Sequence, residues 1–150
     1  MQTASVIASE ARSAAGNLRA SRFASSHRIV LVQGVYYFLT GVWPLVSIDT
    51  FQMVTGPKTD LWLVRTVGAL ITVIALALLA GVRQQPMPAP VVILALGSAL
   101  GLTAIDVIYV TGQVIAPIYL LDAVAELVLI VALALALFHE RKAPGGVRNS

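Results

Sequence analysis

The chain contains no cysteine and few charged residues. Among its 150 residues, Asp, Glu, Lys and Arg together make up 11%, whereas soluble domains contain about 25%. The absence of cysteine excludes disulfide bonds, thiol catalysis and cysteine-ligated metal sites. Hydrophobic residues make up 58% of the chain. This composition indicates a single-domain integral membrane protein rather than a soluble domain.

Histidine is also scarce, which limits the cofactors that the chain could hold. His27 and His139 are far apart in the sequence and lie at the ends of apolar segments, so a haem held by two histidines is not indicated. The string from Gly56 to Thr59 lacks the glycine spacing of a phosphate-binding loop. We therefore expect no cofactor and no metal. The net charge of +3 is concentrated in the tails, where membrane topology explains it without nucleic acid.

Four long apolar runs occupy most of the chain. They cover residues 29–48, 61–82, 90–110 and 115–138. Each is long enough for a helix that rises about 1.5 Å per residue to cross roughly 30 Å of hydrocarbon. Backbone groups in lipid must pair within their own segment, which requires helices. Because the connections are short, the pattern predicts an all-α fold, a membrane-embedded up-down four-helix bundle.

The basic residues predict the orientation of this bundle. Arginines precede the first run, Arg83 separates the second from the third, and Arg141 follows the fourth, whereas the other side has only Lys58. Cytoplasmic loops carry the excess of Lys and Arg, so both termini are expected in the cytoplasm. Residues 1–28 are then a flexible basic cytoplasmic tail, a better reading than an organelle transit peptide. Residues 139–150 form a flexible C-terminal tail.

Four charged residues lie inside the apolar runs: Arg65, Asp106, Asp122 and Glu126. A charge in the middle of a membrane helix costs roughly 3 kcal/mol, so these groups must face one another, water or a ligand. Arg65 and Asp106 each lie about 6 Å from the outer end of their helix, which predicts an ion pair. Asp122 and Glu126 lie deeper, on one helical stripe with Tyr119.

The polar residues concentrate in the outer half of the bundle, because residues 73–82 and 127–138 contain no polar side chain. We therefore predict an outward-facing pocket. Its expected ligand-binding residues are Arg65, Asp106, Asp122, Glu126, Tyr37 and Tyr119. Three carboxylates against one guanidinium require a protonated acid or a bound cation. Glu126 is the deepest acid, and we expect it to be neutral because burial disfavours a charged carboxyl group.

Three further features have two readings each. The tyrosines Tyr36, Tyr37 and Tyr119 also fit a packing role, with each hydroxyl satisfied across helices. The Gly97–Gly101 motif is typical of close helix packing, and we expect it to act inside the bundle rather than in a dimer. The outer loop 49–60 is either a lid over the pocket or a connector, and its mixture of apolar and charged residues favours a lid.

Two stretches carry a resemblance to known proteins. The segments QGVYYFLTGVWP at 33–44 and TGPKTDLWLVRTVG at 55–68 resemble a family of small bacterial four-helix integral membrane proteins. The resemblance covers the first half of the chain and implies a bacterial inner-membrane location, but no particular activity. In architecture alone the chain is similar to DoxX-like and EXPERA-type bundles, and EXPERA-type proteins use buried acids in a ligand pocket. No functional residue is carried over from either.

These observations support three functions to different degrees. The leading hypothesis is a binding module for a small amphiphile or cation. The alternative is an accessory membrane subunit whose intramembrane charges form an interhelical clamp, and the third is a small proton-coupled transporter with Glu126 as the protonation site. An enzyme is least supported, because no nucleophile–base set is present. The expected partners are the lipid bilayer, the ligand, and a homo-oligomer or larger membrane complex.

Overall fold

The computed structural model describes residues 25–141, and all the regular structure in this range is helical. A first helix covers Ser25–Val46. It is followed by α2 (Ile48–Thr55), α3 (Leu61–Gly81), α4 (Ala89–Thr111) and α5 (Tyr119–Arg141). The first helix, α3, α4 and α5 are long and apolar enough to cross a membrane. The predicted tails lie largely outside the described residues, which omit 1–24 and 142–150.

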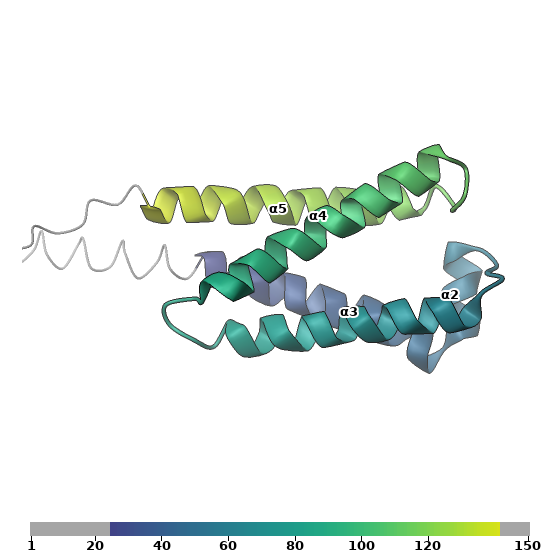
Figure 1. Cartoon of the computed structure of the whole chain (residues 1–150), viewed down its shortest axis with the longest axis horizontal. Helices are drawn as coiled ribbons and strands as arrows, with labels where there is room; N and C mark the ends of the chain where they lie inside the picture. Colours follow the sequence, from purple (N-terminus) through teal and green to yellow (C-terminus); the bar gives the residue numbers. More distant parts are fainter. Residues whose placement is uncertain (1–24, 142–150) are drawn as a thin grey trace, which may run out of the picture.

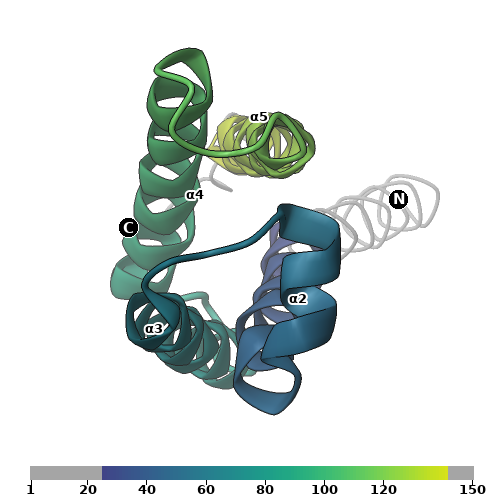
Figure 2. The same ribbon diagram turned by 90° about the vertical axis from the view of Figure 1, so that its right-hand side faces the viewer.

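The four long helices run alternately in opposite directions (Figure 1). The first helix and α3 form one side of the bundle, and α4 crosses obliquely to reach α5 on the other side. Viewed along its length, the bundle carries the short helix α2 across one end, beside the connection to α3 (Figure 2). Among helix pairs α2 to α5, α4 packs chiefly against α5 and only sparsely against α3. The all-α up-down prediction is therefore confirmed.

The observed helix bounds differ from the predicted runs by a few residues at most ends. The largest differences at a helix start are at the first helix, which begins at Ser25 rather than at Ile29, and at α5, which begins at Tyr119 rather than at Ile115. Pro117 lies in a turn before the helix and not in its first turn, with the backbone N–H of Leu120 donating to the Pro117 carbonyl at 3.0 Å.

The connection between the first helix and α3 contains a helix that the hydropathy pattern did not predict. After the first helix ends, α2 folds back so that the Trp43 indole N–H donates to the Thr50 hydroxyl at 2.9 Å. The rings of Trp43 and Phe51 pack edge to face at 5.6 Å. Gly56 then ends α2 with φ +86°, a left-handed conformation that favours glycine. The loop predicted as a lid or connector is therefore partly an ordered helix.

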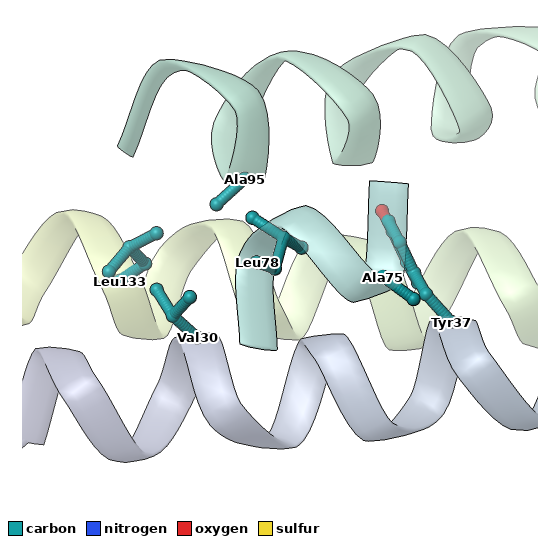
Figure 3. Packing of buried hydrophobic residues seen from close by; sticks show 6 residues of the cluster. All are labelled: Val30, Tyr37, Ala75, Leu78, Ala95 and Leu133. Atoms are coloured by element: carbon teal, nitrogen blue, oxygen red, sulfur yellow. The ribbon is translucent and has the colours of Figure 1, made fainter. Parts of the chain in front are cut away.

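The bundle exposes most of its apolar residues and buries several polar ones, among them Gln33, Asp106 and Glu126. Only a small hydrophobic core is buried, made of Val30, Tyr37, Ala75, Leu78, Ala95 and Leu133 (Figure 3). Large apolar side chains on every long helix are exposed, among them Leu39, Leu70, Ile93 and Leu121. An apolar surface of this extent needs a nonaqueous environment. Together with the four helices of spanning length, it indicates a multi-pass membrane protein.

Glycine brings the first helix and α3 into direct backbone contact. A Cβ atom added to Gly68 would lie 2.7 Å from the Gly41 carbonyl oxygen and 2.8 Å from Pro44 Cγ. A Cβ atom added to Gly41 would lie 2.8 Å from the Thr72 backbone nitrogen. Close approach through small residues strengthens van der Waals packing between membrane helices. This contact anchors the first helix and so positions its polar side chains.

The Gly97–Gly101 motif does not pack inside the bundle, so that prediction was wrong. A Cβ atom added to either glycine would meet nothing within 4 Å. The reason is rotational: Ala95 and Ala99 are the small residues of α4 that are buried. They lie two residues before each glycine, which places the glycines on the other side of the helix.

Candidate functional site

The acids of α5 are held by two consecutive tyrosines of the first helix. The Tyr36 hydroxyl donates a hydrogen bond to Asp122 Oδ1. The Tyr37 hydroxyl donates to Glu126 Oε2 at 2.9 Å. Asp122 and Glu126 are four residues apart and so share a face of α5. The two pairs therefore form one polar seam between the first helix and α5.

Gln33 fixes the direction of the deeper hydrogen bond. Its side-chain amide donates to the Ala95 carbonyl oxygen of α4 at 2.8 Å and to the Tyr37 hydroxyl oxygen at 3.1 Å. A carbonyl oxygen accepts and cannot donate, which orients the Gln33 amide with its NH₂ group towards both partners. The Tyr37 oxygen therefore accepts from Gln33, and its own hydrogen is directed to Glu126. The chain from Gln33 through Tyr37 to Glu126 joins the first helix to α5, and the bond from Gln33 to the Ala95 carbonyl adds α4.

The burial of these groups differs along the seam. Gln33, Tyr37 and Glu126 are fully enclosed, and Glu126 has 0% of its surface exposed. Tyr36 and Asp122 are half-buried. Figure 3 shows the Tyr37 ring reaching from the first helix into the bundle, with its oxygen away from the helix that carries it. The site thus has a shallow tier, Tyr36 with Asp122, and a deep tier, Gln33 with Tyr37 and Glu126.

Asp106 of α4 completes the cluster. Its side chain is buried, and the carboxyl group of Asp122 lies within hydrogen-bonding reach of it. Two ionised carboxylates offer no hydrogen to each other, so this contact requires a proton or a cation. Within the described residues, Asp106 Oδ2 and Glu126 Oε1 are buried without a hydrogen-bond partner; the other such atom is Glu140 Oε1. Two of the three unpartnered oxygens thus belong to one cluster.

Arg65 does not pair with Asp106, and this prediction was wrong. Arg65 is exposed on α3, and the charged group that acts on Asp106 is Asp122. Matched depth alone did not identify the pair because α4 turns chiefly towards α5 rather than α3. An exposed arginine near a helix end can extend its guanidinium to the interface, so Arg65 needs no carboxylate partner.

Tyr119 lies apart from the two tiers, in contact with Lys58 of the connection between α2 and α3. The Lys58 ammonium sits over its ring, 4.8 Å from the centroid. The same ammonium donates to the Thr55 carbonyl oxygen at 3.1 Å. Tyr119 precedes Asp122 by three residues and so lies about one turn from it on the same side of α5. This cation–π contact ties the end of α2 to the start of α5, beside the shallow tier.

Two residues of the cluster were not among the predicted site residues. Gln33 was not assigned to the site. Tyr36 was assigned only to packing, because it lies about 100° around the helix from Tyr37. A pair of adjacent tyrosines facing an acid pair was the available signal, since both hydroxyls need acceptors when buried.

No metal centre is formed in the part of the chain that the structure describes. Its His, Asp and Glu side chains include no group of three that could hold a metal ion. No protein-family model matches the chain, and comparisons with curated proteins and solved structures find no match. The class of site therefore follows from geometry: a buried carboxyl cluster with tyrosine and glutamine donors, inside a bundle of four apolar helices.

Proposed function

We propose that this chain is a membrane binding protein whose interior site takes a small organic cation. The observation that carries the proposal is the composition of the cluster. Asp122 acts on Asp106, and Glu126 lies one helical turn further along α5 beside tyrosine and glutamine side chains, while the one basic residue expected there, Arg65, is exposed instead. A bound cation would supply the positive counter-charge that the carboxyl groups of this site lack.

The unpartnered oxygens favour a cation over an anion or a neutral amphiphile. Asp106 Oδ2 and Glu126 Oε1 are acceptors without donors, and a protonated amine supplies donors together with charge. The ring faces of Tyr36 and Tyr37, whose centroids are 6.0 Å apart, add surfaces that attract cations. An ammonium ligand would use both features.

The membrane setting supports the direction of access. The distribution of arginine and lysine favours cytoplasmic termini, and the resemblance noted above favours the bacterial inner membrane. In that orientation the half-buried tier of Tyr36 and Asp122 is nearer the outer face than Glu126. The ligand would then enter from outside, past Tyr119 and the α2 connection, and an apolar inner half would close the cytoplasmic side.

A charge-reversed ligand pair tests this proposal. We expect phenethylammonium or the smaller methylammonium, whose N–H groups can donate to these oxygens, to raise the melting temperature of the purified protein in detergent, and 3-phenylpropionate, which resembles the first probe in shape but carries the opposite charge, to have no such effect. Asp106→Asn should reduce the shift. Asp49→Asn, on the exposed face of α2, is the matched control and should retain it. Equal shifts with both ions would indicate a hydrophobic effect and contradict the proposal.

The accessory-subunit function is a second candidate, with its own supporting observation. The hydrogen bonds from Tyr36 to Asp122 and from Tyr37 to Glu126 both cross between helices, as a clamp would. A clamp predicts that every cluster variant loses stability and that no cation stabilises the protein. A binding site predicts that Glu126→Gln folds as well as the wild type, because glutamine retains an acceptor for Tyr37.

A further inference from the structure

We propose that cation binding at this site is proton-coupled, with one proton leaving the Glu126 carboxyl group for each monovalent cation bound. The inference rests on the proposed function and adds the regulation of the same site. It is carried by the geometry of the deep tier, where a directed hydrogen-bond chain ends on one oxygen of a fully buried carboxyl group.

The chain assigns different roles to the two oxygens of Glu126. Because Gln33 donates to Tyr37 and Tyr37 donates to Oε2, Oε2 acts as an acceptor. A proton held by this carboxyl group therefore resides on Oε1, the oxygen that has no hydrogen-bond partner. Oε1 is thus both the position of the proton and the free position for a ligand. Gln33 and Tyr37 are positioning residues that keep the carboxyl group in this orientation.

The surroundings of Glu126 require that proton while the site lacks a cation. The titratable groups facing it are Tyr36 and Tyr37 from the first helix, Asp106 from α4 and Asp122 from α5. The buried positions of α3 carry no titratable side chain. Every ionisable neighbour is therefore an acid or a phenol. Ionising Glu126 without a cation would add a second or third buried negative charge to this cluster.

The exchange conserves charge and mass. The neutral Glu126 carboxyl group loses the proton on Oε1 to water and becomes a carboxylate, while one monovalent cation enters the cluster. No covalent bond other than the O–H bond breaks, and the net charge of the site stays the same. A carboxylate that forms only when its counter-charge arrives avoids the desolvated, unpaired state.

Proton counting on the wild-type protein tests the coupling without any variant. Protein in detergent and weak buffer is mixed with phenethylammonium, and a pH indicator measures the protons released against the cation bound by equilibrium dialysis. We expect about one proton to be released for each cation bound. By linkage, the apparent Kd should fall roughly tenfold for each unit by which the pH rises, as long as Glu126 is protonated in the free protein. At a pH high enough to ionise free Glu126, the dependence should disappear.

Two variants assign the proton to its group. Glu126→Gln lacks the carboxylate charge and places an NH₂ group at the position of Oε1, so it should bind the cation more weakly, with a Kd that no longer changes with pH, and should release no proton. Glu140→Gln makes the same substitution on the same helix outside the cluster, and should behave as the wild type. Tyr37→Phe should keep the one-proton stoichiometry but move the pH range over which the Kd changes, which a merely structural residue would not do.

The outcomes separate this inference from the proposed function. Cation binding with no proton release and a flat pH dependence would overturn the coupling and leave the binding function standing. A tenfold slope that persists in Glu126→Gln would overturn the assignment to Glu126 and transfer the proton to the Asp106–Asp122 contact. Failure of both organic cations to bind would overturn the proposed function and the coupling with it.

Discussion

The first helix meets α3 and α5 in opposite ways. Towards α3 it uses glycine, and backbone atoms of Gly41, Gly68 and Thr72 leave no room for an added Cβ atom. Towards α5 it uses tyrosine, and the contact passes through the hydroxyl groups of Tyr36 and Tyr37 to two carboxyl groups. One interface is a close backbone contact, and the other is polar and carries two hydrogen bonds.

The two interfaces show that the helices can associate without the buried acids. Close packing of small residues associates membrane helices without any polar group. Buried acids are a more expensive means to the same end, because each must be neutralised or paired. The glycine contact already anchors the first helix, and this supports the proposal that the acids of the tyrosine seam serve binding rather than assembly.

The largest expected effect is at the glycine contact. Gly68→Ala should destabilise the bundle by about 1–3 kcal/mol, because the new methyl group would be forced into the Gly41 carbonyl. Thermal unfolding in detergent, followed by circular dichroism, measures this loss. Gly97→Ala is the matched control and should be neutral or stabilising by up to about 1 kcal/mol, since alanine favours helix and the position is open. Equal losses at both sites would show that the glycine interface is not a special anchor.

The next effect compares the two tiers of the tyrosine seam. Tyr37→Phe should cost about 1–2 kcal/mol, because Glu126 Oε2 would lose its donor inside the bundle. Tyr36→Phe should cost less, about 0.5 kcal/mol, because the half-buried Asp122 can find another partner. Unfolding by a denaturing detergent measures both. The reverse ranking would mean that the shallow tier, and not Glu126, is the buried part of the seam.

A smaller effect is expected at the connection between α2 and α3. Lys58→Met removes the cation over the Tyr119 ring and should raise the hydrogen-exchange rate of α2 amides, with a stability loss of about 0.5–1 kcal/mol. Lys58→Arg keeps the cation and serves as the control. Unchanged exchange in Lys58→Met would show that the contact between Lys58 and Tyr119 does not hold the connection against α5. The packing of Trp43 on Phe51 would then be enough to keep α2 in place.

The smallest effect is expected at Arg65. Because this side chain is exposed, Arg65→Leu should change the unfolding free energy by no more than about 0.5 kcal/mol. Its folded yield in detergent should match that of the wild type. A large loss of yield would restore the ion pair with Asp106 that matched depth predicted, and would weaken the argument that the cluster lacks a cation.

Much of the fold follows from local properties of the chain. Four apolar runs of spanning length predict four helices, because length and backbone hydrogen bonding leave few alternatives in lipid. The end of each helix is less predictable: Pro117 delays α5, and the short apolar run of α2 is too brief for hydropathy to separate from loop. The acids Asp106, Asp122 and Glu126 were identifiable because charges are rare in such helices.

The contacts between helices could not be predicted in the same way. Depth along each helix paired Arg65 with Asp106, but the rotation of α4 pairs Asp106 with Asp122. Rotation also turns Ala95 and Ala99 inward and leaves Gly97 and Gly101 outside. Each of these outcomes depends on how far a helix is rotated about its own axis. Hydropathy does not determine this rotation, because every face of a membrane-spanning helix is largely apolar.

Composition and spacing alone therefore established the membrane class, the number of long helices and the three acids. Packing then selected which donors those acids receive: Tyr36 for Asp122, and Tyr37, oriented by Gln33, for Glu126. It also removed Arg65 from the site. The physical reason is that insertion depends on each helix separately, whereas a binding site depends on how helices rotate against one another.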